Sequence, residues 1–294
     1  MNKEPLVYII LVNYNSTDHT LECIKSLKQI DYSNYRIIVV DNASNSDERK
    51  KLNELTDDII IIYSNINGGF SFGNNLGMKQ AIKNEAKYIL MLNNDTVVKE
   101  DFLNKMIDEY DDKIGICTSK IYYYDNKEIL WYAGGEINKT MGNSIVYGLN
   151  EVDNGIYNEN KFVTFASGCC MLFSVDIIKK IGYLKEDYFL YYEDTDYCSR
   201  IIENGYKIKY CPKSVIYHKE SVSTVKKSYN YDYYFTRNRL FFIKENLSGV
   251  YKATSYFYTL STGIIKALIN KTNRKAYLKG IRDFVCNKKG KLKL

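Results

Sequence analysis

The first 113 residues alternate between short, unbroken apolar runs and longer stretches in which apolar residues recur every three or four positions. The unbroken runs cover residues 7–12, 37–40, 59–63 and 88–92. Such runs are typical of strands buried on both faces of a parallel sheet, whereas the spacing of Leu21, Ile24 and Leu27 indicates an amphipathic helix. Strand–helix alternation at this spacing predicts an α/β fold with a mostly parallel sheet and helices on both faces.

The alternation ends after Lys113. Strands are expected at 114–124, 165–173, 207–210 and 215–217, with a polar, irregular stretch at 138–160. Beyond Tyr229 the apolar residues recur with helical spacing. One apolar helical stripe comprises Ala253, Tyr256, Phe257, Leu260, Ile264, Ala267 and Leu268. We therefore expect an α/β domain at residues 1–228 and a C-terminal helical extension at residues 229–294.

The net charge of +6 is concentrated at the C-terminus. Residues 271–294 carry nine Lys or Arg against Asp283 alone, which leaves residues 1–270 close to neutral. This distribution argues against a nucleic-acid-binding body. A basic tail that follows an apolar helical stripe suits a helix lying on an anionic membrane surface, and a helix packed against the protein is the alternative.

No segment has the pattern of an export signal or of a membrane span. The apolar run at 6–12 is too short for a signal core, and no run of about 20 apolar residues exists. The seven cysteines are odd in number and lack paired CxxC spacing, which favours buried, reduced thiols. We expect a cytoplasmic protein that contacts the cytoplasmic face of a membrane through its basic C-terminus.

Polar side chains follow the buried run at 88–92. Asn93, Asn94 and Asp95 come directly after it. Because open α/β sheets bind ligands at the carboxyl ends of their strands, Asp95 with the Asn93 amide is a candidate divalent metal site that receives a diphosphate. Local capping of a strand-to-helix turn is the alternative.

The glycine-rich turns that cradle phosphates in other nucleotide-binding proteins are missing. Residues 13–16 contain no glycine, the glycines at 68, 69 and 73 do not fit the dinucleotide fingerprint, and no Walker A motif is present. This argues against a nicotinamide-binding Rossmann domain, even though Asp41 ends the second predicted strand. Without a glycine cradle, a diphosphate at this edge would need a metal.

Several other polar or aromatic residues have two interpretations each. The acids at 193, 194 and 196 lie at a predicted helix start, where the helix dipole favours anions, but a well-capped helix has the same pattern. His218 ends a predicted strand and is more often structural in such a place. Trp131, the only tryptophan, is expected in the core rather than stacked on a sugar. Arg237 and Arg239 either reach a diphosphate or form surface ion pairs.

Taken together, these stretches resemble glycosyltransferase family 2, the inverting nucleotide-sugar transferases of the GT-A fold. They are most similar to its bacterial rhamnosyl- and galactofuranosyltransferase-like members, and the resemblance covers residues 6–245. The segments that carry it are Val12-Asn13-Tyr14-Asn15, Val40-Asp41-Asn42-Ala43-Ser44, Asn67-Gly68-Gly69-Phe70, Gly73-Asn74-Asn75, Leu92-Asn93-Asn94-Asp95, Ser167-Gly168, Tyr192-Glu193-Asp194 and His218.

The resemblance implies a role for each matching residue. Asp194 corresponds to the catalytic base, and Asp95 and His218 to metal or diphosphate ligands. The residues implied in nucleotide-sugar binding are Val12, Tyr14, Asp41, Asn67, Asn74 and Asn94. Asn93 departs from the family pattern, because it stands where the first acid of the Asp-x-Asp motif is usual. An amide oxygen ligates Mg²⁺ or Mn²⁺ without adding charge.

The implied function is transfer of a sugar from a UDP- or dTDP-sugar to a hydroxyl of a saccharide or lipid-linked glycan, with Mg²⁺ or Mn²⁺, in cell-surface polysaccharide synthesis. A single displacement needs a base facing the acceptor and a cation stabilising the leaving diphosphate. The alternatives are a sugar-nucleotide pyrophosphorylase and a catalytically inactive sugar-nucleotide-binding or membrane scaffold protein. The oligomeric state does not follow from the sequence.

Overall fold

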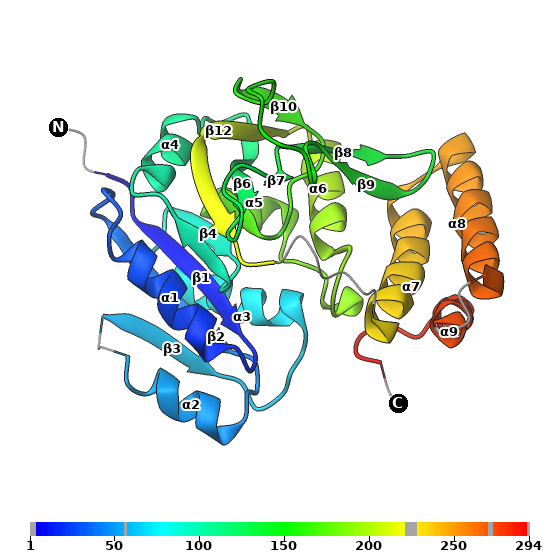
Figure 1. Cartoon of the computed structure of the whole chain (residues 1–294), viewed down its shortest axis with the longest axis horizontal. Coiled ribbons are helices and arrows are strands. Elements are labelled where there is room, and N and C mark those ends of the chain that lie inside the picture. The colour runs from blue at the N-terminus through cyan, green and yellow to red at the C-terminus, as the bar shows by residue number, and fades with distance from the viewer. Residues whose placement is uncertain (1–3, 56–57, 221–227, 270–272, 293–294) are drawn as a thin grey trace.

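A computed structural model of the chain describes residues 4–55, 58–220, 228–269 and 273–292 (Figure 1). The N-terminal half has the predicted alternation of strands and helices. Its elements are β1 (Val7–Asn13), α1 (Thr17–Leu27), β2 (Tyr35–Asp41), α2 (Ser46–Leu52), β3 (Ile59–Tyr63), α3 (Phe70–Lys83) and β4 (Tyr88–Leu92). These four strands are parallel, in the order β4-β1-β2-β3. The expected α/β fold class is confirmed.

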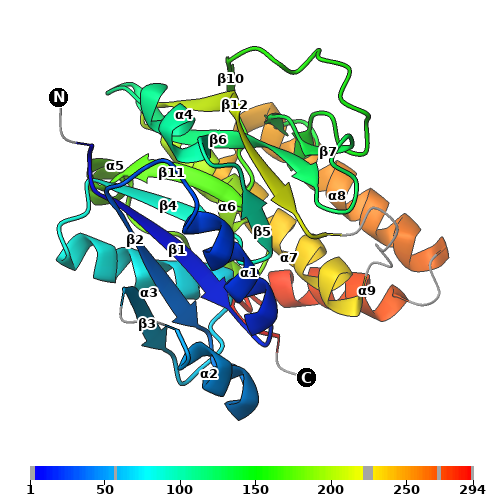
Figure 2. The ribbon, with the colours of Figure 1, turned by 60° about the vertical axis from the view of Figure 1, so that its left-hand side comes forward.

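The helices of this half cover both faces of the sheet. Right-handed crossovers from β1 to β2 and from β2 to β3 place α1 and α2 on one face, and the return to β4 places α3 on the other (Figure 2). With both faces covered, the residues of β1, β2 and β4 are largely buried, and Ile9, Ile38 and Leu90 are fully buried. β3, at the edge of the sheet, is only partly buried. This burial explains why the strands are unbroken apolar runs rather than alternating ones.

The second half extends the same sheet with mixed strand directions. Its elements are β5 (Thr96–Val98), α4 (Phe102–Asp108), β6 (Ile114–Tyr123), β7 (Leu130–Tyr132), β8 (Gly135–Asn138), β9 (Asn143–Val146), β10 (Lys161–Val163), β11 (Cys170–Ser174), α5 (Val175–Ile181), η1 (Glu186–Tyr188), α6 (Glu193–Glu203) and β12 (Lys207–His218). The order of the described main sheet is β10-β12-β6-β11-β4-β1-β2-β3. β11 lies antiparallel between β4 and β6, and β12 runs parallel to β6.

Two strand predictions are corrected. The strands expected at 207–210 and 215–217 form one strand, β12, whose register against β6 shifts between Cys211 and Val215. The strand expected from residue 165 begins only at Cys170, because residues 165–169 approach the edge of the sheet as a loop. The stretch expected to be irregular, residues 138–160, contains one complete strand, β9, which pairs with β8 as an antiparallel hairpin.

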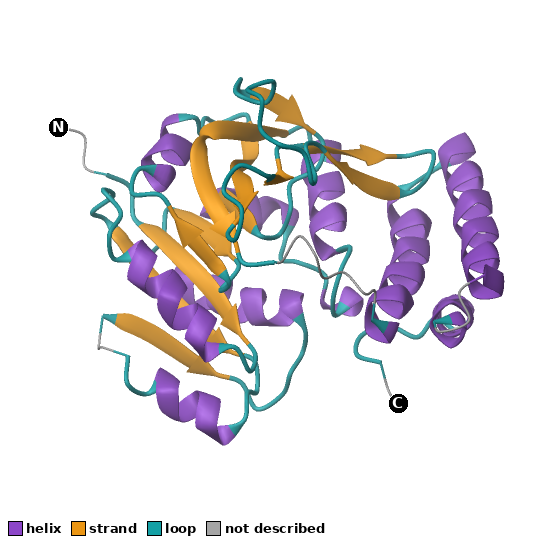
Figure 3. Ribbon diagram, viewed as in Figure 1, coloured by secondary structure: helices purple, strands orange, loops and turns teal. Residues whose placement is uncertain are grey.

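The predicted C-terminal helices are α7 (Tyr229–Asn246), α8 (Gly249–Ile269) and α9 (Arg274–Val285). They stand together at one end of the molecule, with α8 outermost (Figures 1 and 3). A cluster of buried apolar side chains connects α7 to the segment before α6: Tyr188, Tyr192, Phe241, Phe242, Ile243 and Leu247. Among the described helices, none is long and apolar enough to cross a membrane.

The basic C-terminus is partly held by ion pairs. Lys289 Nζ lies 2.8 Å from both Asp187 and Glu245. Lys279 and Lys288 lie within 4 Å of Asp283. Of the other expected basic residues, 271 and 293 lie outside the described residues. Lys289 therefore joins the tail to η1 and α7, and Asp283 pairs with two further lysines within the tail.

Candidate active site

A buried polar network lies at the carboxyl ends of β1 and β2. The amide of Asn13, which is fully buried, donates to Asp41 Oδ1 at 3.3 Å and to Ser44 Oγ at 3.2 Å, and Thr20 Oγ1 donates to Asn13 Oδ1 at 3.0 Å. Arg49 Nε donates to the other Asp41 oxygen at 2.7 Å. Asp41 is therefore fully buried and hydrogen-bonded within the protein, and it orients the turn after β1. Its implied contact with the nucleotide stays a prediction.

The other residues implied in nucleotide binding surround this network. Val12 packs against Gly73, where an added Cβ would lie 2.7 Å from Val12 Cγ1, so the glycine lets α3 approach β1. Asn67 Oδ1 accepts the Gly69 N–H at 3.0 Å. Asn74, which is almost completely buried, donates to the Phe70 carbonyl at 3.0 Å. Tyr14 is 48% exposed, so its ring is accessible to a ligand.

Asn94 joins the turn after β4 to the turn after β1. Its Nδ2 donates to Ser16 Oγ and to Thr20 Oγ1, both at 2.8 Å. The two turns are thus brought together at one edge of the sheet, as expected for the carboxyl ends of adjacent parallel strands. Asn94 positions this edge through its side chain, and its contact with a donor stays a prediction.

Asp95 and His218 meet at this edge although they are 123 positions apart in the sequence. β5 pairs antiparallel with β12 so that Thr96 lies opposite His218, which places Asp95 beside the histidine. Asp95 Oδ1 lies 3.1 Å from His218 Nε2. Burial raises the pKa of Asp95, but the hydrogen bond and charge of His218 lower it, and the net result lies below the ordinary value. The residues predicted as metal ligands are adjacent in space.

Trp131 and Glu220 form the wall behind His218. The indole ring of Trp131 contacts the imidazole edge to face, with centroids 4.6 Å apart, and its Nε1 donates to Glu220 Oε2 at 2.7 Å. That carboxylate lies 3.8 Å from His218 Nδ1. The expectation that Trp131 belongs to the core holds in part: the residue is half-buried and packs against the main hydrophobic core, and its ring also contacts the candidate ligand His218. In the sequence, the only sign of this second contact was that Gly134 and Gly135 follow shortly after the tryptophan.

Asp194 lies in the first turn of α6. Its Oδ1 accepts the Thr195 N–H at 2.7 Å, and its Oδ2 accepts the Gly168 N–H at 3.2 Å. Burial raises its pKa above the ordinary aspartate value, while these N–H donors act in the opposite direction. A partly exposed carboxylate with a raised pKa is suited to accept a proton.

The segment before β11 contacts both Asp194 and the end of β4, where Asn93 leads to Asp95; we call this edge of the sheet the Asp95 edge. The Gly168 N–H binds Asp194, and the carbonyl of the next residue, Cys169, accepts the Asn93 N–H at 2.9 Å. Residues 168 and 169 therefore contact both the candidate base and the strand end that carries the candidate metal ligands. Residues 167 and 168 were singled out by resemblance, but this bridging role needs the structure.

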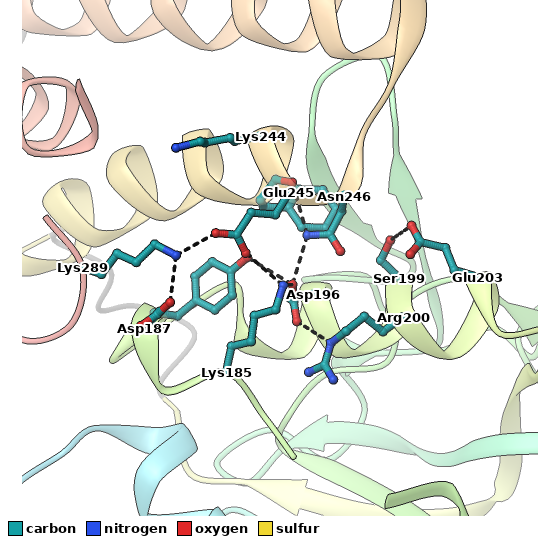
Figure 4. A network of polar contacts seen from close by, with 12 residues as sticks. Lys185, Asp187, Asp196, Ser199, Arg200, Glu203, Lys244, Glu245, Asn246 and Lys289 are labelled. Atoms are coloured by element: carbon teal, nitrogen blue, oxygen red, sulfur yellow. Dashed lines mark hydrogen bonds and ion pairs between the residues drawn. The ribbon is translucent and has the colours of Figure 1, made fainter. Parts of the chain in front are cut away.

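Asp196, which shares the first turn of α6 with Asp194, has a structural environment. It is fully buried, and its oxygens lie 2.8 Å from Lys185 Nζ and from Arg200 Nε. Asn246 of α7 also donates to it, at 3.0 Å (Figure 4). Two acids on one helix turn thus have different environments.

Among the described residues, Arg237 and Arg239 do not form the expected surface ion pairs, and a contact with a diphosphate stays a prediction. Arg237 is buried and donates to Tyr188 O at 3.1 Å and to Gly290 O at 2.7 Å, so it is not a surface residue. Arg239 Nε donates to the Met141 carbonyl at 3.1 Å, in the β8–β9 turn. Both guanidinium groups bind backbone carbonyls of the protein itself.

The amino-acid sequence of this chain is similar to those of several glycosyltransferases. A chain 30% identical over 79% of this chain and 73% of its own length is the low-salt glycan biosynthesis hexosyltransferase Agl10 of Haloferax volcanii. The rhamnosyltransferase WbbL of Escherichia coli is 27% identical over 70% of this chain and 81% of its own. A dTDP-rhamnosyl transferase, RfbF of Shigella flexneri, is 22% identical over 75% of this chain and 71% of its own.

Solved structures show the same fold at low identity. The mannosyltransferase PcManGT from Pyrobaculum calidifontis, in complex with GDP-Man and Mn²⁺, has a TM-score of 0.63 at 13% identity and covers 98% of this chain and 89% of its own. TarS of S. aureus, residues 1–349, has a TM-score of 0.59 at 17% identity over 96% of this chain and 81% of its own. The fold is therefore GT-A, as expected.

The family model described as Glycosyl transferase family 2 matches residues 8–182, more than half of the chain. This range contains the β1 turn, the Asp95 edge and the segment before β11. Together with the 30% identical relative, the match establishes that the chain is a glycosyltransferase and belongs to glycosyl transferase family 2.

Proposed function

We propose that this glycosyltransferase moves a sugar from a UDP- or dTDP-sugar to a hydroxyl of a saccharide or lipid-linked glycan, with inversion at the anomeric carbon. The observation that carries the proposal is that residues 168 and 169 contact both parts of the site. The Gly168 N–H binds Asp194, and the Cys169 carbonyl binds the N–H of Asn93, which is close to the Asp95–His218 pair. An inverting displacement needs this division, with a base toward the acceptor and charge stabilisation toward the leaving diphosphate.

The Asp95 edge suits a divalent cation, Mg²⁺ or Mn²⁺. Asp95 Oδ1 and His218 Nε2 are 3.1 Å apart, and the adjacent Asn93 could add an amide oxygen. No three His, Cys, Asp or Glu of the described ranges gather as a metal cluster, so diphosphate oxygens and water would complete an octahedral shell. When bound, the cation supplies charge stabilisation for the diphosphate. Glu220, beside Nδ1, would orient the imidazole.

Asp194 is the proposed base. Its carboxylate is held by the Gly168 and Thr195 N–H groups, and its raised pKa favours accepting a proton from the acceptor hydroxyl as the bond to the anomeric carbon forms. The names of two relatives, a low-salt glycan biosynthesis hexosyltransferase and a putative teichuronic acid biosynthesis glycosyltransferase of Bacillus subtilis, support an acceptor that belongs to a surface polysaccharide.

The protein is further proposed to act in the cytoplasm and to rest on an anionic membrane through α8. This helix packs inward with its small residues Ser255, Thr259, Gly263 and Ala267. The opposite side carries exposed apolar residues: Phe257 at 76%, Ile264 at 51% and Leu268 at 66%. The adjoining helix, α9, presents the exposed cations Arg274, Lys275 and Arg282. An apolar face beside cations matches an anionic lipid surface.

Vesicle sedimentation tests the membrane contact. The protein is expected to bind anionic vesicles at low salt, and Phe257→Ser with Leu268→Ser should abolish binding because the apolar face is lost. Ile156→Ser, which removes an equally exposed apolar residue (67%) far from α8 in sequence, is the matched control. Wild-type protein that ignores anionic vesicles would contradict the proposal.

A panel of nucleotide sugars, with and without Mn²⁺, tests the activity. The true donor should raise the melting temperature only with metal, because the proposed site binds the diphosphate through the cation. At 100 times its Kd, a ligand stabilises the folded state by about 2.7 kcal/mol. Slow, metal-dependent release of nucleoside diphosphate should follow. Binding without any cleavage would indicate an inactive binding protein, and no metal-dependent shift by any nucleotide sugar would reject the donor class.

A further inference from the structure

The segment that leads into α6 has an unusual backbone. Three residues of the four that precede Glu193 have positive φ angles although none is glycine: Phe189 at 64°, Tyr191 at 67° and Tyr192 at 76°. Bulky L-residues are disfavoured in this region, and such residues persist only when the surrounding structure holds them. Tyr192 is the N-cap of α6, so this conformation sets the direction in which the helix and Asp194 begin.

Buried side chains of α7 bind this segment from one side: Arg237 Nη2 donates to the Tyr188 carbonyl at 3.1 Å, and Asn238 makes three further contacts. Asn238 Nδ2 donates to the carbonyls of Tyr188 at 2.9 Å, Leu190 at 2.8 Å and Tyr191 at 2.9 Å. Asn238 is fully buried, and its own Oδ1 accepts Arg237 Nε at 2.9 Å. One amide thus binds three backbone carbonyls of this segment, and the neighbouring guanidinium group of Arg237 fixes the orientation of the amide.

The opposite side of the segment contacts the start of α3. The Phe189 carbonyl accepts the Phe70 N–H at 2.8 Å. Gly69 has a φ of +91°, and an added Cβ there would lie 2.1 Å from the Phe189 oxygen, so only glycine permits the contact. Asn67, implied in nucleotide binding, bonds to the Gly69 N–H. The segment before Asp194 is therefore held between α7 and the candidate nucleotide loop.

We propose that Asn238 is a positioning residue: it holds residues 188–192, three of which have positive φ angles, in this conformation and so places the Asp194 carboxylate toward the acceptor. The inference rests on the proposed role of Asp194 as base. It assigns to the C-terminal helices a part in catalysis that is separate from any membrane contact, because α7 supplies the amide. A misplacement of about 1 Å at a reacting group lowers a rate by about 10²-fold.

The test compares Asn238→Ala with Asn75→Ala. Asn75 is an equally buried asparagine, on α3, whose side chain bonds to Leu184 and Glu186 rather than to residues 188–192. Both variants should melt at lower temperature. Below those temperatures Asn238→Ala is expected to lower kcat about 10²-fold with donor Kd unchanged, whereas Asn75→Ala should keep kcat. Asn238→Ser, which retains one donor, should recover part of the rate, and it replaces the alanine variant in the assay if that variant does not fold.

Three outcomes would overturn the inference, and Asp194→Asn measured in parallel separates its failure from that of the proposed function. If Asp194→Asn is inactive while folded Asn238→Ala and Asn238→Ser turn over like the wild type, Asn238 is only structural. If Asn75→Ala loses as much kcat as Asn238→Ala, the loss is general loosening. If Asp194→Asn itself is active, the assignment of the base fails, and the positioning role fails with it.

Discussion

Replacing Asp194 by Asn removes the proposed base with little change of shape. In the folded protein one oxygen becomes an NH₂ group, so one of the two N–H groups, that of Gly168 or that of Thr195, loses its acceptor. An unsatisfied donor costs about 1–3 kcal/mol. That cost is offset in part because the amide avoids burying a charge, whose burial raises the Asp194 pKa. We therefore expect a small change in melting temperature.

The expected effect on transfer is much larger. A positioned general base contributes about 10²–10⁴-fold, equivalent to about 3–5 kcal/mol of activation free energy. Donor affinity should stay near that of the wild type, because the base acts on the acceptor hydroxyl. The assay combines calorimetry of donor binding in Mn²⁺, turnover at saturating substrates and thermal unfolding. Turnover within tenfold of the wild type would refute the assignment.

The pH dependence gives a second readout of the same group. Because burial raises the pKa of Asp194, the wild-type rate should fall on acidification at a higher pH than an ordinary aspartate would require, and the residual rate of Asp194→Asn should lack this step. The sign for folding is opposite: a carboxyl with a raised pKa binds protons more tightly in the folded state. Its contribution to stability therefore decreases as pH rises from the unfolded to the folded pKa.

Four further substitutions test the remaining parts of the site. Asp95→Ala should abolish metal-dependent donor binding and Asn93→Asp should tighten the metal by adding charge; equal donor affinity in EDTA and in Mn²⁺ would contradict both. His218→Ala should lower turnover more than the melting temperature, and a large fall in melting temperature with full activity would make the histidine structural. Asp196→Ala should destabilise the fold by about 3 kcal/mol in urea unfolding, because Lys185 and Arg200 lose a buried partner; a change below about 1 kcal/mol would show that the network is not needed.

Local patterns in the sequence were sufficient for the architecture of the N-terminal half. Apolar runs at 7–12 and 88–92 became β1 and β4 because a strand covered on both faces must be apolar throughout. The resemblance to the family rested on short segments near strand ends, and the family assignment is confirmed. The start of α6 was also predictable, since acids at a helix start are a local signal.

Tertiary structure decided which of these residues meet and which are accessible. Asp95 and His218 come together because β5 pairs with β12, a pairing that no local periodicity encodes. Asp194 and Asp196 have equivalent positions in the sequence, but only packing against Lys185, Arg200 and α7 makes the second a buried ion-pair partner. The roles of polar residues depend on neighbours distant in sequence, so they follow from the packed structure rather than from the pattern of the chain.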